Sequence, residues 1–290
     1  MEHLNNEFEG KLSLGIEIFK NSYNKRFLHD LVSSQLDMDR LDYLKRDSFF
    51  TGVTEGGIGS DRIIKMLRVV NDELAVEEKG IYSVEQFIVA RRIMYWQVYL
   101  HKTVIASEIM MRKAVQRAKD ESKKQGIFAT PALAYFFDNE ENLNNINKID
   151  DFSLETFAKL DDSDIIVSMK EWMNHSDKVL SIISKSLINR NLFKVEISRN
   201  EFDPDLIESL RIQVAEKYSL TDKDVKDLVF SEKIKNKAYS IEEDVKINIL
   251  LKSGKLSDIA KASDLDNIRA LSKTVEKYFL CYPKEPDYRR

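Results

Sequence analysis

Apolar positions recur at helical spacing over most of the first 190 residues, and polar or glycine-bearing stretches interrupt them. The pattern predicts two helices within residues 11–50, and Ser34 is expected to cap the second one, with Asp37 completing a capping box. The stretch TGVTEGGIGSD predicts a break, after which the run IIKMLRVV is again apolar-periodic. A turn near residues 78–80 is expected before a long segment at about 83–124.

Beyond this long segment the pattern weakens and then changes its period. The last third of the segment, RKAVQRAKDESKK, predicts a solvated basic face. ATPALAYFF then indicates a short helix and NEENLNNINKIDD an exposed loop, before helices around residues 152–187. After residue 190, LFKVEIS and KINILLKSG are typical of strands, with further helices expected at about 204–217 and 266–280.

These elements predict a mainly α protein with a boundary near residue 190. Residues 1–190 are expected to form a helical domain and residues 191–290 a small α+β subdomain. Composition agrees, because 9 Gly and 4 Pro in 290 residues leave few places to break a helix. The 32% charged and 43% hydrophobic residues suit amphipathic helices packed on one another.

Charge and cysteine content restrict the partners and the compartment. The net charge of -4 argues against a general nucleic-acid binder. Cys281 is the only cysteine, so no intramolecular disulfide is expected and a reducing, cytoplasmic location is favoured. The N-terminus lacks the basic n-region of a signal peptide, and no apolar run approaches the roughly 18 residues that span a bilayer. No membrane partner is therefore expected.

The stretch SSQLDMDRLDYLKRDS carries many carboxylates on one predicted helix. On a helix, Asp39, Tyr43 and Asp47 fall within about 80° of one another, while apolar side chains point the opposite way. Asp42 and Arg46 form a separate i, i+4 pair that needs no role beyond surface stabilisation. One face of this helix is therefore core, and the other is acidic and carries a phenol.

A second polar stripe lies on a helix that is otherwise apolar almost all round. Its members, Arg91, Tyr95 and Tyr99, are again spaced by four, and the helix should be buried. A buried guanidinium needs partners, and Asp39 or Asp47 is the expected internal one. Spacing alone leaves two readings open, a buried ion network and a polar ligand pocket.

Three blocks of sequence resemble the HD-domain phosphohydrolases, in the branch that contains the deoxynucleoside triphosphate triphosphohydrolases. They are LVSSQLDMDRLDYLKRDSFFTGV, EEKGIYSVEQFIVARRIMYWQVYLHKT and RNLFK at residues 190–194. The resemblance covers most of residues 25–195. It implies an HD-domain-like helical bundle, a divalent metal, a deoxynucleoside triphosphate (dNTP) ligand and assembly into homo-oligomers.

The resemblance also implies roles for the two polar stripes. Asp39 matches the carboxylate that closes the family's metal site, and Tyr43 and Asp47 match residues that contact the substrate sugar. Arg91 matches a residue that binds substrate phosphate. Tyr99 matches an aromatic residue near the sugar and base, and its neighbour Tyr95 is included among the substrate contacts although the family position can be a histidine.

A further set of residues matches the regulatory nucleotide site of vertebrate family members. This set consists of Lys79, His101, Lys102, Arg190 and Lys194. Glu77 stands where the vertebrate enzymes have arginine, which is a departure from the family pattern.

Most of the family's metal ligands have no match. The family uses a His, a His-Asp pair and the distant Asp, a set that suits divalent metals, with Mg, Mn, Fe, Ni and Zn not distinguished. The dipeptide His29-Asp30 lies only ten residues before Asp39, too close for the family spacing, and is not expected to bind metal. The resemblance implies that the first ligands would precede residue 1. The chain is then expected to be the C-terminal two-thirds of such an enzyme and inactive alone.

Three functions are compared on this basis. The leading one is a metal-dependent phosphohydrolase of dNTPs, releasing triphosphate, with catalysis belonging to the complete protein. The alternative is a non-catalytic nucleotide-binding or oligomerisation module. Nucleic-acid binding through RKAVQRAKDESKK is a weaker third reading.

Two features are expected to be structural. GVTEGGIGSD lacks the GK[ST] ending of a phosphate loop and is expected to be a turn between helices. His175 is expected to be a surface or capping histidine.

Overall fold

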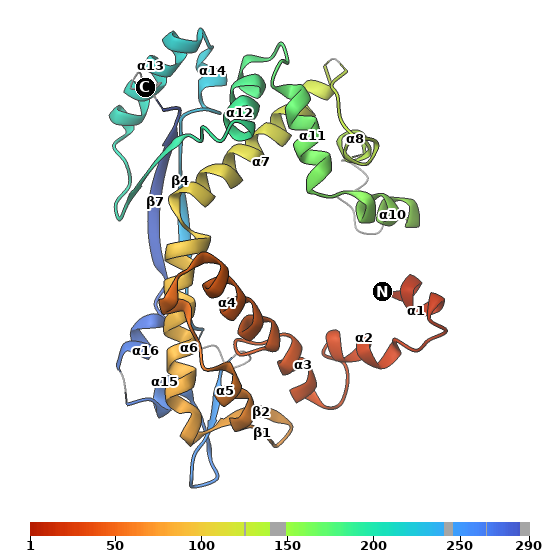
Figure 1. Cartoon of the computed structure of the whole chain (residues 1–290), viewed down its shortest axis with the longest axis vertical. Helices are drawn as coiled ribbons and strands as arrows, with labels where there is room; N and C mark the ends of the chain where they lie inside the picture. The colour runs from red at the N-terminus through yellow and green to blue at the C-terminus, as the bar shows by residue number, and fades with distance from the viewer. Residues whose placement is uncertain (125, 140–148, 241–245, 265, 285–290) are drawn as a thin grey trace. The chain divides into compact units, whose positions relative to one another are not determined.

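The computed structural model describes residues 1–124, 126–139, 149–240, 246–264 and 266–284, and it is mostly helical with two small sheets (Figure 1). The chain divides into two compact units. Unit 1 comprises residues 1–101 and 235–275, and unit 2 comprises residues 102–234 and 276–290. The division expected from the sequence placed one boundary near residue 190, which lies inside unit 2.

Helices make up most of unit 1. They are α1 (Glu2–Glu7), α2 (Ser13–Phe19), α3 (Arg26–Val32), α4 (Met38–Thr51), η1 (Thr54–Gly56), α5 (Ser60–Met66), η2 (Glu78–Gly80), α6 (Ile81–Met94), η3 (Tyr95–Tyr99), α15 (Ile259–Ala262) and α16 (Asp266–Leu271). Their core is formed by apolar side chains of α4, α5 and α6 packed against strand residues. The expected break at 51–61 and turn at 78–80 are confirmed.

Helix α4 begins later than its sequence predicted. Its N-cap is Asp37, whose Oδ1 accepts from the Arg40 backbone N–H at 2.8 Å, and not Ser34. The expected pairing of Ser34 with Asp37 does exist, because Asp37 Oδ2 accepts from the Ser34 N–H at 3.0 Å, but it closes a turn that precedes the helix. Asp37 therefore fixes both the turn and the first helical residues.

A close approach of the chain holds α4 near α6. A side chain at Gly56 would collide with Met94, which is fully buried in α6. A larger residue would force Met94 to move, so the small size of Gly56 lets η1 pack closely against α6. This packing brings the polar faces of α4 and α6 to the same region.

Unit 1 also contains a four-stranded sheet of order β1-β2-β5-β6, where β1 is Leu67–Val70, β2 is Glu73–Glu77, β5 is Asn248–Leu250 and β6 is Leu256–Asp258. β2 pairs with β1 and β5 with β6 in antiparallel register, and β2 pairs with β5 in parallel. The run IIKMLRVV is thus half helix and half strand. Asn71 and Asp72, both at positive φ, form the hairpin turn that sequence reasoning missed.

The expected long segment at 83–124 is interrupted. After α6 the chain makes a π-helical turn, η3, in which the Leu100 N–H donates to the Tyr95 carbonyl at 2.7 Å. The chain then enters unit 2 as α7 (Lys102–Ser122). Such π-turns are frequent at functional sites, and this one carries two of the three members of the second polar stripe.

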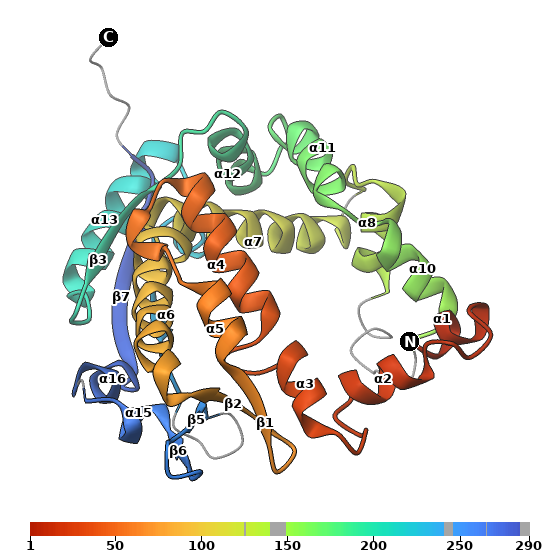
Figure 2. The same ribbon diagram turned by 60° about the horizontal axis from the view of Figure 1, so that its bottom comes forward.

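Unit 2 contains α7, α8 (Pro131–Asp138), α10 (Asp151–Lys159), α11 (Asp162–Trp172), α12 (Lys178–Ile188), α13 (Pro204–Tyr218) and α14 (Asp222–Val225). α7 packs against α12 and β3 (Lys194–Ser198), as Figure 2 shows for α12. The sheet order is β3-β7-β4, with β4 at Phe230–Asn236 and β7 at Val275–Tyr282. The predicted helix at 204–217 and strands near 194 and 248 are confirmed, whereas most of the expected loop at 139–151 lies outside the described residues.

The predicted helix at 266–280 is confirmed at its start and wrong beyond residue 271. α16 ends at Leu271, and β7 begins at Val275. The segment VEKYFLCY is rich in β-branched and aromatic residues, and it pairs antiparallel with β3, so tertiary pairing decides its conformation. Cys281 is fully buried in this strand, and burial raises the pKa of its thiol to about 12.

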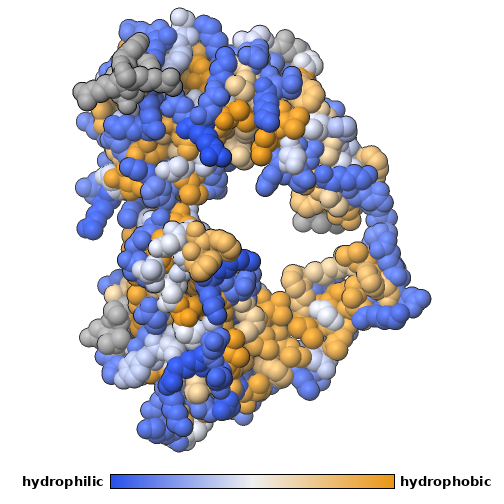
Figure 3. Space-filling model, viewed as in Figure 1, coloured by the Kyte–Doolittle hydropathy of each residue, from blue (hydrophilic) through white to orange (hydrophobic). Residues whose placement is uncertain are grey.

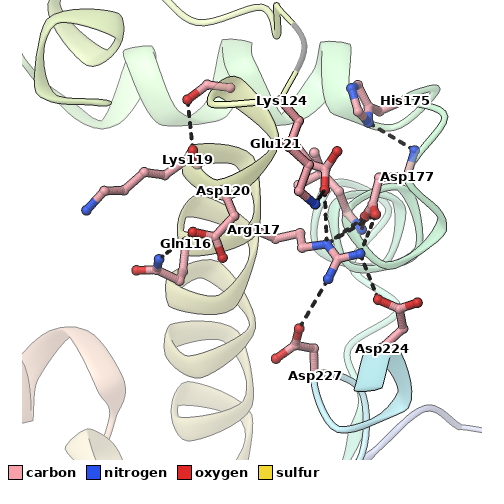
Figure 4. Close-up of polar contacts among 12 residues, drawn as sticks. Gln116, Arg117, Lys119, Asp120, Glu121, Lys124, His175, Asp177, Asp224 and Asp227 are labelled. Atoms are coloured by element: carbon pink, nitrogen blue, oxygen red, sulfur yellow. Dashed lines mark hydrogen bonds and ion pairs between the residues drawn. The ribbon is translucent and has the colours of Figure 1, made fainter. Parts of the chain in front are cut away.

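The basic run at 112–124 is not a simple solvated face. Arg117, whose side chain is 14% exposed, lies among four carboxylates (Figure 4). Its Nε is 3.1 Å from both oxygens of Asp177, its Nη2 is 2.8 Å from Asp224, and Glu121 and Asp227 lie within 3.8 Å. This network ties α7 to the start of α12 and to α14, so the prediction of a solvated basic face is wrong at its centre.

His175, expected to be a surface or capping histidine, is half-buried and hydrogen-bonds to the backbone just before α12. Its Nδ1 accepts from the backbone N–H of Asp177 at 3.0 Å, and Asp177 is the N-cap of α12 (Figure 4). Asp177 thus caps α12 and also binds Arg117.

The three N-terminal helices expose apolar side chains. No residue of α1, α2 or α3, all of which the structure describes, is buried. Apolar side chains gather over this part of unit 1 (Figure 3), and the exposed ones are Leu4, Phe8, Leu12, Leu14, Phe19 and Val32. Among the described residues, no helix is both long enough and apolar enough to cross a bilayer.

Candidate functional site

The acidic stripe of α4 lies as its periodicity predicted. Leu41 and Leu44 are buried on one side, and Asp39, Tyr43 and Asp47 lie on the other. Asp39 is exposed in the first turn, whereas Tyr43 and Asp47 are half-buried. The surface pair is also confirmed, with Arg46 Nη1 3.1 Å from Asp42 Oδ2. The carboxylates of this helix therefore differ in role, as expected.

The second stripe meets the first through hydrogen bonds and ring contacts. The Tyr99 hydroxyl donates to Asp47 Oδ2 at 2.7 Å. The Tyr99 ring is edge-on to Tyr43, with centroids 6.0 Å apart, and to Tyr95, with centroids 5.2 Å apart. Two segments separated by about fifty residues of sequence thus build one cluster of three phenols and a carboxylate.

The phenols of Tyr43 and Tyr99 stay protonated at neutral pH. Burial raises the pKa of Tyr99, and the hydrogen bond to Asp47 raises it further. Burial and the neighbouring Tyr95 likewise raise the pKa of Tyr43, although Arg91 and Arg40 act in the opposite direction. Both hydroxyls therefore keep their protons, and that of Tyr99 donates a hydrogen bond to Asp47.

Arg91 does not have the partner that was expected. In the described part of the chain it forms no ion pair with Asp39 or Asp47, and its guanidinium lies 5.8 Å from the centre of the Tyr95 ring. Its Nε is buried without any hydrogen-bond partner. The expectation that Asp39 or Asp47 pairs with Arg91 is wrong. An unsatisfied buried donor costs roughly 1–3 kcal/mol, and more when charged, which a bound anion would offset.

A cavity of about 290 Å³ lies beside Arg91. It is lined by Ser33, Ser34, Gln35, Arg40, Arg91, Lys237 and Ser240. The lining is cationic and rich in hydroxyl and amide groups, which are typical ligands of phosphate oxygens. Sequence reasoning missed Arg40, which adjoins Asp39 in the same motif, and Lys237, which no motif marks.

The described residues do not form a metal site. They contain no group of three or more His, Cys, Asp or Glu side chains that could hold an ion. Asp39 is a single exposed carboxylate, and the further ligands of an ion would have to come from outside these residues. In the His29-Asp30 dipeptide, which was not expected to bind metal, the ring nitrogen Nδ1 of His29 contacts the backbone, 3.0 Å from the Ile18 carbonyl.

Asp30 lines a separate cavity of about 220 Å³ in unit 1. Burial raises the pKa of this carboxyl, and a backbone hydrogen bond from Leu74 opposes the shift. Glu73 accepts from Asn248 Nδ2 at 2.8 Å, and Arg26 lies 3.9 Å from Asp30. This cavity is therefore lined by charges of both signs, with Asp30 and Glu73 as well as Arg26 and Lys246.

The residues matched to a regulatory site are divided between the two units. Lys79 and His101 belong to unit 1, whereas Lys102, Arg190 and Lys194 belong to unit 2. Each unit by itself therefore holds only part of the set.

Two ion pairs involve residues of the predicted regulatory site or its neighbour Glu77. In unit 2, Lys194 Nζ lies 2.7 Å from Glu196, and the hydrogen bond with this carboxylate raises the pKa of the lysine. In unit 1, Glu77 pairs with Arg68 at 2.6 Å, so the residue that departs from the vertebrate pattern has a local partner.

The mainly helical fold, with its carboxylate–phenol cluster beside a cavity, is compared with known proteins to identify its class. Residues 58–130 match the model of the HD associated region. A crystal structure of a phosphohydrolase from Bacteroides thetaiotaomicron is 51% identical, with a TM-score of 0.88, over 98% of this chain and 70% of that chain. The chain belongs to the family of HD-type phosphohydrolases.

More distant relatives extend the comparison. The uncharacterized protein YwfO of Bacillus subtilis is 29% identical over 276 residues, which are 93% of this chain and 60% of the relative. The deoxynucleoside triphosphate triphosphohydrolase SAMHD1 homolog of Dictyostelium discoideum is 28% identical over 97 residues, 32% of this chain and 19% of the relative. The chain thus spans less than two-thirds of the length of these curated relatives. The family and the mainly helical fold with a small α+β part, both predicted from sequence, are confirmed.

Proposed function

We propose that the chain supplies the substrate-binding face of an HD-type phosphohydrolase that acts on dNTPs and releases triphosphate. The observation that carries this proposal is the buried, unpartnered Nε of Arg91 between the phenol cluster and a cationic cavity. The name of the Dictyostelium relative supports the choice of dNTPs over other phosphate compounds.

The two polar stripes would divide the ligand between them. Tyr43, Asp47 and Tyr99 present a carboxylate and aromatic rings to the sugar and base. Arg91 faces the phosphates, where its fixed donors stabilise the negative charge that develops as a phosphate ester is cleaved. Because Tyr99 and Asp47 already bond each other, the sugar would meet a preformed surface.

Hydrolysis would need more than these residues. The divalent ion of the family supplies an activated water, and Asp39 is the one described residue that we assign to its ligand set. We propose that the remaining ligands lie outside the described residues and that the 290-residue chain alone binds dNTPs without hydrolysing them. Hydrolysis of dGTP with Mn²⁺ that is abolished by Asp39→Ala would contradict this part of the proposal.

Thermal unfolding with and without ligand tests the binding. The metal-free chain is expected to gain stability with dGTP or dATP, and Arg91→Met is expected to lose that gain. Arg68→Met is a matched control, because Arg68 is an exposed guanidinium of the same unit that pairs with Glu77. The proposal fails if millimolar dNTPs give no shift, or if the Arg91 variant shifts as the parent does.

A second candidate is an oligomerisation module, and the exposed apolar face of α1, α2 and α3 favours it. This proposal places a second copy of the chain on that face, in keeping with the oligomers that the family resemblance implies. Sedimentation of the chain is expected to show a dimer or larger, and Phe8→Asp with Phe19→Asp is expected to give monomers. A monomeric parent protein would exclude the oligomerisation module.

The regulatory nucleotide site stays a prediction. Its residues are Lys79, His101, Lys102, Arg190 and Lys194.

A further inference from the structure

The last turn of α4 carries two phenylalanine side chains that lie in solvent. Phe49 and Phe50 are each 79% exposed, more than any other large apolar side chain in the part of the chain that the structure describes. Their rings meet edge-on, with centroids 5.3 Å apart. Exposed apolar side chains that lie together mark a surface that binds a ligand or a partner.

Phe50 lies on the polar face of α4, opposite the face that packs in the core. At about 100° per residue, Phe50 falls about 20° from Asp39, inside the arc of about 80° that runs from Asp39 to Asp47. Arg46 shares this arc, and its guanidinium pairs with Asp42 at 3.1 Å and lies 3.9 Å from Asp47. The stripe that carries the phenol cluster therefore continues to the end of the helix as an exposed ring.

The order of groups along α4 gives the ligand a direction. The cavity beside Arg91 is lined by residues 33–35, which precede the helix, and by Arg40 in its first turn. The phenol cluster with Asp47 occupies the middle of the helix. At about 1.5 Å per residue, Phe50 lies about 4.5 Å beyond Asp47 along the axis and about 15 Å beyond Arg40. Since the sugar of a nucleotide separates its phosphates from its base, phosphates at the start of α4 and a sugar at its middle put the base at the end.

The end of α4 is fixed, so the ring of Phe50 has a defined place. Gly52 ends the helix in the left-handed conformation, with a φ of 72°. The buried Ser48 hydroxyl donates to the Val53 carbonyl at 2.7 Å and holds the chain that leaves the helix. A ring on such a backbone loses little conformational freedom when a base stacks on it.

We propose that Phe50 stacks on the base of the bound nucleotide and sets the base preference of the site. This inference rests on the proposed function, in which Arg91 meets the phosphates. Stacking tolerates every base because each has a π-face, and a larger ring system buries more surface against the phenylalanine. The favoured ligand class is therefore a purine deoxynucleoside triphosphate over a pyrimidine one.

Calorimetric titration of the metal-free chain with dGTP, and with inorganic tripolyphosphate as a ligand without a base, tests Phe50. Phe50→Ala is expected to lower the affinity for dGTP about tenfold and the affinity for tripolyphosphate by less than about twofold. Phe50→Trp keeps a stacking ring and is expected to bind dGTP at least as tightly as the parent. The exposure of Phe50 means that neither change disturbs the core.

Tyr82→Ala is the matched control. It removes a 64% exposed aromatic ring of the same unit, about 180° around α6 from Arg91. Its expected effect on the affinity for dGTP is less than about twofold. Equal losses in Tyr82→Ala and Phe50→Ala would overturn the inference.

The base preference has its own readout. The parent is expected to bind dGTP and dATP severalfold more tightly than dCTP and TTP, and Phe50→Ala is expected to reduce this difference to less than about twofold. Sedimentation of the same variant tests the rival reading, a contact between protein chains. Unchanged dGTP affinity together with a changed oligomeric state would assign Phe50 to such a contact and overturn the inference.

The outcomes separate the inference from the proposed function. If Arg91→Met loses tripolyphosphate binding while Phe50→Ala binds dGTP as the parent does, the inference fails and the proposed function stands. Equal losses of dGTP and tripolyphosphate binding in Phe50→Ala also overturn the inference, because the ring would then not act through the base. If the parent binds neither ligand, the proposed function fails and the inference fails with it.

Discussion

Arg91 and Arg117 are both half-buried arginines on long helices, and their surroundings are opposite. Arg117 in unit 2 has four carboxylates within 3.8 Å. Arg91 in unit 1 has an aromatic ring 5.8 Å away and a buried Nε without a hydrogen-bond partner among the residues that the structure describes. A guanidinium that is neutralised internally is part of the architecture, whereas one left unsatisfied beside a cationic cavity is available to an anion.

The largest expected effect is on stability, from Arg117→Met. Removal of the cation leaves Asp177 and Asp224 without their partner, which costs about 3–5 kcal/mol for a buried network. Urea unfolding measures the loss. The matched control is Arg112→Met, whose guanidinium is 61% exposed beside Glu232 and is expected to matter by less than about 1 kcal/mol. Equal effects of the two changes would remove the structural role of Arg117.

Arg91→Met should behave in the reverse way. The change removes an unsatisfied buried donor, so the free energy of unfolding is expected to change by less than about 1 kcal/mol. Affinity for dGTP, measured by calorimetry without metal, is expected to fall by about a hundredfold, as for the loss of a desolvated charged contact. A destabilisation as large as that of Arg117→Met would show that Arg91 is structural too.

The Arg117 network also predicts a pH dependence. Burial acts to raise the pKa of Asp224, but hydrogen bonds from Thr221 and Arg117 outweigh burial and lower it below 3.8. A lowered pKa means stability that is present above the unfolded value and is lost as the pH falls through the folded value. Asp224→Asn is therefore expected to lessen the loss of unfolding free energy between pH 5 and pH 3, by about 1 kcal/mol. Parallel curves for parent and variant would contradict this.

The smallest expected effect comes from Tyr99→Phe. The change removes the hydrogen bond to Asp47 and keeps the ring contacts with Tyr43 and Tyr95, so stability is expected to fall by about 1 kcal/mol. Affinity for dGTP is expected to fall only severalfold, because Arg91 is untouched. Thermal unfolding and calorimetry measure the two quantities. A loss of affinity as large as that of Arg91→Met would place the phosphates against the phenol cluster instead.

Periodicity predicted the polar faces of α4 and α6 correctly, and motif resemblance identified the family. These signals are local, and a helix keeps its residues on one face whatever lies opposite. The partners of the two arginines are not local. Sequence reasoning paired Arg91 with Asp39 or Asp47 and left Arg117 in solvent, and both expectations are wrong. Asp177 and Asp224 reach Arg117 from distant segments, and Lys237 lines the cavity beside Arg91 from another.

The strands show the same limit at the level of the fold. KINILLKSG and LFKVEIS carry enough apolar and β-branched residues to be recognised as strands. VEKYFLCY reads as the end of a helix until its pairing with β3 is known, and LRVV is a strand because the Asn71-Asp72 turn folds it onto β2. The strand conformation of these segments depends on pairing with other segments, and a short stretch of sequence does not reveal that pairing.

The most direct test is a crystal structure of the metal-free chain with a non-hydrolysable dNTP analogue. If Arg91 binds a phosphate group of the nucleotide, a phosphate oxygen will lie about 3 Å from its Nε, and the contacts of Arg117 will be unchanged. Phosphates bound elsewhere, or Arg91 Nε paired with a protein carboxylate while the nucleotide is bound, would contradict the assignment.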